Sequence, residues 1–374
     1  MIGRELLRRS FPIVPAMALS VFGACGSRTG LPTPTEREAP SCPADTPHDP
    51  ANCGRCGHDC CGGECQDGVC QPVMIASGRD GPIDVAVDES RVVWTEFAPG
   101  RPGRILSCPK SGCIGSPAVL VQQGAPEIVV LGGGTMFWVD GQGEKGDRRI
   151  LRCDGDCAQP PTVIASGLSN PENLAIDERH VYWTDLVDET VLACPLDGCA
   201  GAPTVLTSGE NNVSGIAVDA TSLYYGAYTQ VAKCPLDGCA HGRMVLASTV
   251  DRSPWGTSIA TPSAIAVDPT TVYWIDYVGG TVARCALAGC GGQGTALYVT
   301  NQSEYPIDIA IDDTIVYWPT ERAGTVLACD KAGCGGRPHV LASGQGHPLH
   351  IALDERCVYW TNSKSGEVMK VAKP

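Results

Sequence analysis

The stretch DERHVYWTD (residues 177–185) decides the fold, because versions of it recur at regular intervals along the chain. Seven copies carry an aromatic residue at one position, at spacings of 42 to 49 residues: Trp94, Trp138, Trp183, Tyr225, Trp274, Trp318 and Trp360. Six copies also carry an aspartate six residues before the aromatic residue, and Gly132 stands there in the second copy. An aspartate at the end of a strand suits a tight turn, since its carboxylate can accept hydrogen bonds from backbone N–H groups two residues on. The sequence therefore predicts seven equivalent structural units.

Each unit contains four short runs of residues that are typical of β-strands. The first unit opens with the apolar run 85–87, and the third unit continues through the runs 181–183, 190–194 and 204–207. Short β-branched runs bounded by Gly, Pro and Asp are strand signals. Four strands per repeat, iterated seven times, predict an all-β fold, namely a seven-bladed β-propeller of four-stranded blades over residues 72–374.

The two ends of this segment predict how the ring closes. The seventh copy reaches Pro374 after its third strand and lacks a fourth, whereas residues 72–78 (PVMIASG) match the fourth-strand pattern of residues 340–344 (VLASG). We therefore expect the N-terminal segment to complete the last blade and to remove the open sheet edges of the ring.

A short motif links this segment to a known family. Residues 182–185 (YWTD) form a complete YWTD motif, and partial versions occur at residues 94–96, 273–276 and 359–362. On these motifs, residues 72–374 resemble the β-propellers of low-density lipoprotein receptor relatives, which have six blades. The preceding segments look like those of bacterial surface lipoproteins. The resemblance implies a YWTD-type propeller in a bacterial surface lipoprotein.

The N-terminus predicts export and a membrane anchor. Residues 1–24 combine three arginines with an apolar stretch and small residues, which is the pattern of a signal peptide. Residues 22–25 (FGAC) resemble a lipobox, in which Cys25 is diacylated and becomes the mature N-terminus. The alternative is simple secretion after Gly23, with Cys25 left as a free thiol. Residues 26–41 are rich in Pro, Thr and charge, so that residues 25–41 are interpreted as the lipidated cysteine and a flexible tether.

Residues 42–71 form a cysteine-rich module with almost no apolar residues. Such a segment cannot fold by burial, so cross-links must hold it: its cysteines are Cys42, Cys53, Cys56, Cys60, Cys61, Cys65 and Cys70. The spacing from Cys53 to Cys60, with His58 inside, also suits zinc. An exported context oxidises thiols first, so three disulfides with one cysteine left over are favoured.

Six blades each carry a close pair of cysteines between the third and fourth strands: Cys108/Cys113, Cys153/Cys157, Cys194/Cys199, Cys234/Cys239, Cys285/Cys290 and Cys329/Cys334. Each pair supplies only two ligands, and each belongs to a different blade, so we expect disulfides within blades and no metal. The seventh blade has Cys357 alone. We expect Cys357 to bridge to an odd cysteine of the module, and Cys61 is the candidate.

Composition and motifs exclude several functions. The formal net charge is -14 and no basic run occurs, so nucleic acid is not an expected partner. The chain lacks a G-x-S-x-G elbow, a P-loop and an H-E-x-x-H helix motif. No catalytic residue and no firm cofactor is predicted from motifs.

One constellation suggests a site. Alignment on the repeated aromatic residue places Asp84, Ile128, Asn173, Gly215, Ala264, Asp308 and His350 at the entrances of successive innermost strands. Asp308, His350 and Asp84 fall on blades six, seven and one, which are neighbours in a closed ring. Two carboxylates and an imidazole at a channel mouth predict a site for a hard cation such as Ca²⁺, or for a polar ligand that also contacts Asn173. The alternative is a solvated polar rim.

The loops on the same face depart from the repeat. Residues 97–103 and 141–148 are longer than their counterparts, and the insertion 251–258 carries Trp255, the one tryptophan outside the repeat. Such loops are where recognition tends to lie, although Trp255 could also anchor its own loop. The sequence therefore favours a tethered extracytoplasmic propeller that binds a protein or glycan. The alternative is a cation-dependent propeller enzyme, lactonase-like or lyase-like, with its site at the channel mouth.

Overall fold

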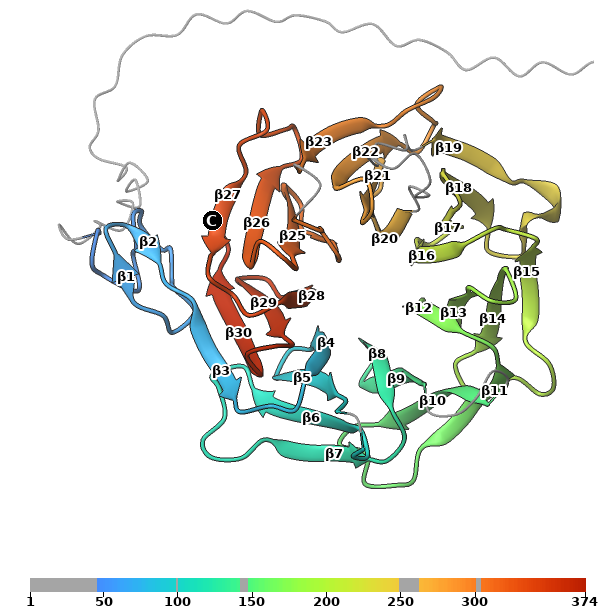
Figure 1. Cartoon of the computed structure of the whole chain (residues 1–374), viewed down its shortest axis with the longest axis horizontal. Coiled ribbons are helices and arrows are strands. Elements are labelled where there is room, and N and C mark those ends of the chain that lie inside the picture. The colour runs from blue at the N-terminus through green and yellow to red at the C-terminus, as the bar shows by residue number, and fades with distance from the viewer. Residues whose placement is uncertain (1–45, 99, 142–146, 249–261, 301–303) are drawn as a thin grey trace, which may run out of the picture. The chain divides into compact units, whose positions relative to one another are not determined.

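The computed structural model describes residues 46–98, 100–141, 147–248, 262–300 and 304–374. Residues 42–374 form one compact unit, in which seven four-stranded antiparallel sheets stand around a central channel. Figure 1 shows the ring, with the first strand of each sheet innermost. The prediction of an all-β, seven-bladed propeller with four-stranded blades is confirmed.

The strands follow the repeat copy by copy. Blades one to four comprise β4 (Pro82–Val87), β5 (Arg91–Glu96), β6 (Arg104–Pro109) and β7 (Ala118–Gln122); β8 (Pro126–Gly132), β9 (Thr135–Asp140), β10 (Arg148–Asp154) and β11 (Thr162–Leu168); β12 (Pro171–Ile176), β13 (His180–Asp185), β14 (Thr190–Pro195) and β15 (Thr204–Ser208); and β16 (Val213–Val218), β17 (Ser222–Ala227), β18 (Gln230–Pro235) and β19 (Met244–Ser248). A short 3₁₀ helix, η1 (Cys239–His241), follows β18.

Blades five to seven continue the pattern. They comprise β20 (Pro262–Val267), β21 (Thr271–Asp276), β22 (Thr281–Ala286) and β23 (Thr295–Val299); β24 (Ala310–Ile311), β25 (Ile315–Thr320), β26 (Thr325–Asp330) and β27 (His339–Ala342); and β28 (Pro348–Leu353), β29 (Cys357–Asn362), β30 (Glu367–Ala372) and β3 (Val73–Ser77). The module contributes a two-stranded ribbon of β1 (Cys65–Gln66) and β2 (Val69–Cys70). No helix in the described part of the chain is long and apolar enough to cross a membrane.

The repeated aspartate shapes the turn between the first and second strands. In blade three, Asp177 Oδ1 accepts hydrogen bonds from the backbone N–H groups of Arg179 and His180. The hydroxyl of Tyr182 donates to Asp177 Oδ2 at 2.8 Å. The turn predicted from the sequence is therefore present, and the tyrosine of the motif locks the same carboxylate from the second strand.

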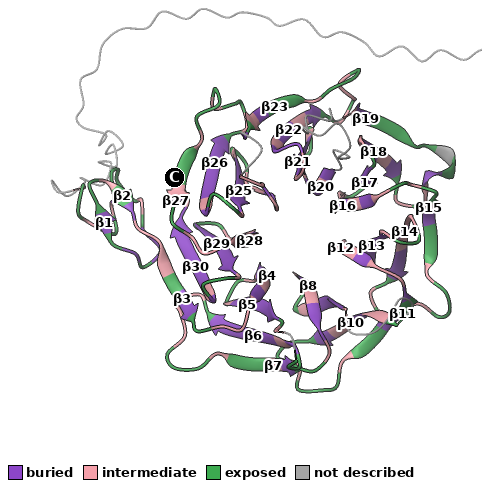
Figure 2. Cartoon of the chain, in the orientation of Figure 1, coloured by how far each residue is buried: buried purple, intermediate pink, exposed green. Residues whose placement is uncertain are grey.

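The repeated aromatic residue fills the space between blades. Trp183 is fully buried, and it packs with Leu174 of its own blade and Phe137 of the preceding blade. Seven such clusters occupy the seven junctions between neighbouring blades, and Figure 2 shows that burial follows the inner strands while the outer strands are exposed. Core packing therefore lies between the blades, because a single four-stranded sheet cannot bury its own faces.

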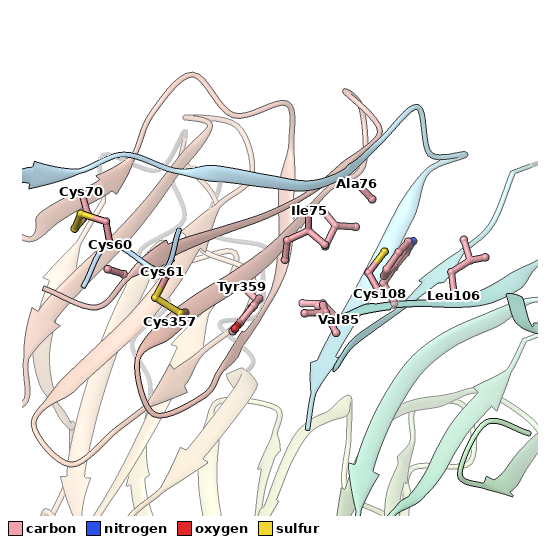
Figure 3. Close-up of a cluster of buried hydrophobic side chains, with 14 of the residues drawn as sticks. Cys60, Cys61, Cys70, Ile75, Ala76, Val85, Leu106, Cys108, Cys357 and Tyr359 are labelled. Atoms are coloured by element: carbon pink, nitrogen blue, oxygen red, sulfur yellow. A yellow bond between two sulfur atoms is a disulfide. The ribbon is translucent and has the colours of Figure 1, made fainter. Parts of the chain in front are cut away.

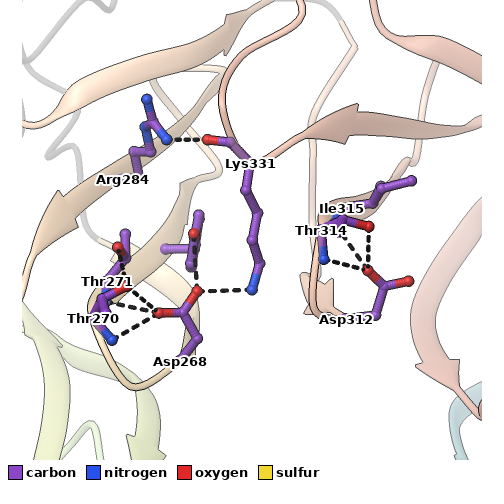
Figure 4. Close-up of polar contacts among 9 residues, drawn as sticks. Asp268, Thr270, Thr271, Arg284, Asp312, Thr314, Ile315 and Lys331 are labelled. Carbon is purple, nitrogen blue, oxygen red and sulfur yellow. Dashed lines mark hydrogen bonds and ion pairs between the residues drawn. The ribbon is translucent and has the colours of Figure 1, made fainter. Parts of the chain in front are cut away.

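Ion pairs clamp three of the junctions. Lys331, directly after β26, donates from Nζ to Asp268 Oδ2 of the preceding blade at 2.7 Å (Figure 4). The same position after the third strand holds Lys373, which pairs with Asp312, and Lys110, which pairs with Asp354. Although burial raises the pKa of Asp268, the hydrogen bonds from Lys331 and the turn lower it well below its ordinary value. Leucine takes this position in blades three to five: Leu196, Leu236 and Leu287.

The ring closes as the sequence predicts. Strand β3 pairs antiparallel with β30, with Val73 opposite Lys370 and Ser77 opposite Glu367. The module precedes β3 directly, and a disulfide joins Cys61 of the module to Cys357 of β29. Figure 3 shows this bond beside Ile75 and Tyr359 in the cluster at the closing junction. The last blade is therefore closed by hydrogen bonds and by a covalent bond.

Disulfides hold both the module and the blades. The module contains the bonds Cys53–Cys65 and Cys60–Cys70, and Cys56 is also disulfide-bonded. Each blade pair is bonded within its own blade: Cys108–Cys113, Cys153–Cys157, Cys194–Cys199, Cys234–Cys239, Cys285–Cys290 and Cys329–Cys334. So many disulfides indicate an extracellular or otherwise oxidising environment. Cys25, Cys42 and the whole segment 1–41 lie outside the described residues.

Candidate functional site

The candidate site is the mouth of the central channel. Asp84 lies in β4, His350 in β28 and Asn173 in β12, while Asp308 stands just before β24. All four line one cavity of about 390 Å³, whose remaining walls are mostly aliphatic side chains of the innermost strands. The residues that the repeat alignment singled out therefore share one cavity, because equivalent positions in a propeller lie at the same height along the axis.

His350 stands between the two acids. Its Nδ1 lies 3.4 Å from Asp84 Oδ1 and 3.4 Å from Asp308 Oδ2. Burial raises the pKa of Asp84 to about 6, although His350 and backbone hydrogen bonds oppose the rise. Burial alone would lower the pKa of His350, but the carboxylates of Asp84 and Asp308 raise it to about 9. At neutral pH an imidazolium is therefore held between two carboxylates, and it relieves their mutual repulsion.

Backbone N–H groups also donate hydrogen bonds to both carboxylates. Asp84 accepts from the N–H of Val85 in its own strand and of Val129 in the next blade, at 2.8 and 2.7 Å. Asp308 repeats the arrangement with Ile309 and with Ile351 of the next blade, at 2.8 and 2.9 Å. Each oxygen of each carboxylate thus receives a backbone N–H. The acids tie together the innermost strands of neighbouring blades.

Asn173 has a different partner. Its Nδ2 lies 3.5 Å from the carbonyl oxygen of Ser263 in blade five, two blades away. In blade four, Gly215 occupies the equivalent position, and a Cβ there would lie 3.0 Å from the Pro262 carbonyl oxygen of blade five. Asn173 therefore lines the same cavity as the three charged residues. Its hydrogen bond goes to blade five, whereas the charged residues lie on blades six, seven and one.

Two further acids near the mouth were not singled out from the sequence. Glu127 and Glu172 immediately precede Ile128 and Asn173, and Arg148 Nη1 lies 3.2 Å from Glu127 Oε2. Burial raises the pKa of Glu127, and Arg148 opposes the rise. Burial also raises the pKa of Glu172. Their signal was present in the alignment one position earlier, but blades without an acid there gave no recurrent pattern.

The face that carries the channel mouth also carries the loops between second and third strands. The loop of residues 97–103 has seven residues, whereas the loops 186–189, 321–324 and 363–366 have four each. Its Arg101 Nη1 bonds Asp80 Oδ2 at 2.8 Å, which fixes the loop against the entry to blade one. The longer loop of blade two is described only at its two ends. Trp255 lies outside the described residues, so its predicted role in recognition stays a prediction.

A tyrosine pair orders the same face at blades five and six. The rings of Tyr277 and Tyr305 lie 4.9 Å apart, and the Arg322 guanidinium stands 4.3 Å from the centre of the Tyr305 ring. The hydroxyl of Tyr277 donates to Glu321, whose other oxygen lies 3.4 Å from His347 Nδ1. Because the Tyr305 ring contacts both Tyr277 and Arg322, the cluster stiffens the loops that carry these residues.

The sequence offered two places for a metal, and at the module it favoured disulfides over zinc. Among the described residues, one group of three or more potential ligands has all its atoms close together, namely Cys53, Cys60 and Cys70. These sulfur atoms are in disulfides, so they cannot act as thiolate ligands for zinc. The calcium site at Asp84, Asp308 and His350 stays a prediction. A calcium ion there would compete with the proton that His350 carries.

Comparison with known proteins supports the fold and leaves the function open. No known protein-family profile matches the chain. A segment of 65 residues is 40% identical to mouse nidogen-2 and covers 17% of this chain but only 4% of nidogen-2. Virginiamycin B lyase from Staphylococcus aureus matches with a TM-score of 0.63 at 12% identity, over 81% of this chain and 99% of the lyase. The WD40 propeller of Doa1 matches with a TM-score of 0.60 at 13% identity, over 81% and 97% of the two chains.

Proposed function

We propose that the chain is an extracytoplasmic propeller, tethered to a membrane, that binds a protein or glycan partner through its loop-bearing face. The observation that carries the proposal is that the charged residues of the channel mouth already have partners within the protein. Asp84, Asp308 and His350 are bound to one another and to backbone amides, which makes the mouth a fixed polar surface. A general base needs a pKa near the working pH, and an imidazolium with a pKa of about 9 does not provide one at neutral pH. The pKa of Asp84 is raised to about 6, but both of its oxygens already accept backbone N–H groups.

The second candidate function is an enzyme of the lyase or lactonase type that depends on a divalent cation. The similarity to virginiamycin B lyase covers the fold, and a form of that enzyme in which one histidine is changed to alanine is described as catalytically inactive. In this chain, His350 lies at the channel mouth, and its imidazolium could donate a proton to a bound substrate. The two functions differ in which residues they need.

A binding assay with two variants separates them. In the first variant, residues 97–103 are replaced by the four-residue loop 186–189, and in the second, His350 is changed to Gln. With envelope extract as the source of partners, we expect the loop variant to lose a partner that the parent and His350→Gln both retain. The enzyme would be favoured by a different result. In that case the loop variant would bind partners as the parent does, and His350→Gln would lose a turnover activity that the parent has.

The location of the chain is part of the same proposal. We expect Cys25 to carry the lipid, and the tether 26–41 to hold the propeller away from the membrane. A fatty-acid analogue should label the parent and leave Cys25→Ala unlabelled, and the variant should appear in the soluble fraction. Equal labelling of both proteins would exclude Cys25 as the lipidation site.

A further inference from the structure

A second cavity lies where the cysteine-rich module meets the outer side of the propeller. It has a volume of about 380 Å³ and lies between the module and the ends of blades six and seven. The module contributes Arg55, His58 and Val69, and the propeller contributes Val340 of β27 and Lys373. None of these residues belongs to the loop-bearing face, so this groove is separate from the channel mouth.

One wall of the groove is a sheet edge. Strand β27 is the outermost strand of blade six, and among the described strands its backbone pairs with β26 alone, on its inner side. An outer edge strand presents N–H and C=O groups that can pair with another extended chain. Val69 of β2 and Val340 of β27 line the same cavity, and Figure 1 shows the module on the outer side of this edge. An extended segment lying here would have β27 on one side and the module on the other.

The groove exposes apolar side chains on both of its walls. Val340 of β27 is 59% exposed, and Val69 of the module is 57% exposed. Each stands beside the cavity, so a peptide in the groove could cover both with aliphatic side chains. Covering such area is favourable by roughly 25 cal/mol per Å² of apolar surface.

The charge of the groove differs from that of the protein. Among the described residues, its lining includes no Asp or Glu side chain, although the chain carries a net charge of -14. Lys373 lines the groove but already pairs with Asp312, so we assign recognition of a ligand's charge to Arg55. The guanidinium of Arg55 donates to the Pro374 carbonyl oxygen at 2.9 Å, which holds this cation at the groove wall. With the Arg55 guanidinium on its wall and no acidic side chain among its described lining residues, the groove favours a carboxylate from a ligand.

The module is fixed in place against the propeller. His58 contacts the carbonyl oxygens of Cys53 and Lys373 at 2.7 and 2.8 Å, and the bond Cys61–Cys357 anchors the same part of the module. Both walls are therefore preorganised, which reduces the entropy that is lost when a ligand binds.

We propose that this groove binds an extended peptide segment of a partner protein, with alternating acidic and aliphatic side chains, as an additional strand on β27. Backbone hydrogen bonds to β27 supply the affinity, while Val69, Val340 and Arg55 select the side chains. The site lies beyond the proposed function, because it needs neither the loops nor the channel mouth.

Two synthetic peptides test the inference on the full chain without its signal peptide. An alternating Glu-Val octapeptide and its Lys-Val counterpart, each carrying a fluorophore, are titrated with the protein and followed by fluorescence anisotropy. We expect the Glu-Val peptide to bind and the Lys-Val peptide to bind at least about tenfold more weakly. Val340→Asp and Arg55→Glu should each weaken Glu-Val binding at least about tenfold.

A matched variant controls for surface charge. Val205 lies on β15, the outer strand of blade three, and is 55% exposed, so Val205→Asp makes the same change at an edge without the module. It should bind as the parent does. Hydrogen exchange should also slow at the β27 amides when the Glu-Val peptide binds. No binding at millimolar protein, equal weakening by Val205→Asp, or unchanged exchange at β27 would each overturn the proposal.

Discussion

At the residue scale, His350 shows how one protonated side chain can offset the negative charge of two neighbouring carboxylates. Its proton is shared between the buried carboxylate of Asp84 and the partly buried carboxylate of Asp308, which belong to the blades on either side, so one imidazolium links three blades at their innermost strands. The pKa of His350 is about 9 in the folded protein and 6.5 for an ordinary histidine. The protonated form is therefore more stable in the folded state than in the unfolded state.

This difference predicts a pH-dependent contribution to stability. The stabilisation by His350 is complete below pH 6.5 and is lost as the pH rises through about 9. The full difference corresponds to roughly 3 kcal/mol. In urea unfolding, the parent should exceed His350→Gln in stability by more at pH 6.5 than at pH 9.5. An equal gap at the two pH values would show that the histidine does not titrate in this range.

Calcium binding at the mouth depends on the same proton. Without the imidazolium, the two carboxylates carry a net charge of minus two. A hard cation can then take the place of the proton that His350 holds between them. We predict that millimolar calcium raises the melting temperature of His350→Gln more than that of the parent at about pH 7, by mass action. Asp84→Asn combined with His350→Gln should remove the increase. A calcium effect that is equal in all three proteins would place the ion elsewhere.

The repeat pattern predicts where these residues lie but not which partners they have. Counting from the repeated aromatic residue gives equal heights in the ring, which is why Asp84, Asp308 and His350 meet. The same counting placed Asn173 with them, and Asn173 does line the same cavity, yet its amide donates to Ser263 of blade five. A repeat pattern defines backbone positions, whereas hydrogen-bond partners depend on the size of the side chains between them.

At the scale of elements, the turn after the third strand determines how neighbouring blades are joined. Lysine at this position pairs with the repeated aspartate of the preceding blade, and leucine packs into the cluster between blades. Both solutions hold the outer part of a blade against its neighbour. Blades six, seven and one, which surround the ring closure, use the ion pair.

The disulfides differ in the length of chain that they close. Cys61–Cys357 joins residues 296 positions apart, whereas Cys108–Cys113 joins residues five apart. A cross-link restricts the unfolded chain more when its loop is longer. We predict that replacing Cys61 and Cys357 together with Ser destabilises the protein by about 2–5 kcal/mol. Replacing Cys108 and Cys113 should cost less, and a larger loss for the short loop in urea unfolding would contradict this account.

At the scale of the whole molecule, the repeat made the ring predictable and left the module unplaced. The number of blades, the four strands and the closing strand follow from periodic residues, and each agrees with the structure. The groove beside β27 does not, because it depends on how a segment held by disulfides rests on two blades. The lone cysteine of the last blade predicted a bond between Cys357 and the module, with Cys61 as the candidate, but no periodic signal describes a surface formed by a single copy.

The final prediction concerns closure of the ring. Strand β3 supplies the outer edge of blade seven, although nearly the whole propeller separates it in sequence from β30. Deleting residues 72–78 exposes β30, whose partner side would then pair with other chains. It also removes Ile75, which packs in the closing cluster, and joins Gln71 directly to Arg79, which shortens the link between the module and blade one. We expect the variant to melt non-cooperatively or to aggregate, measured by calorimetry and light scattering.

A matched deletion in the tether, residues 30–36, should melt as the parent does. If the 72–78 deletion also melted as the parent does, β3 would not be needed to close the ring.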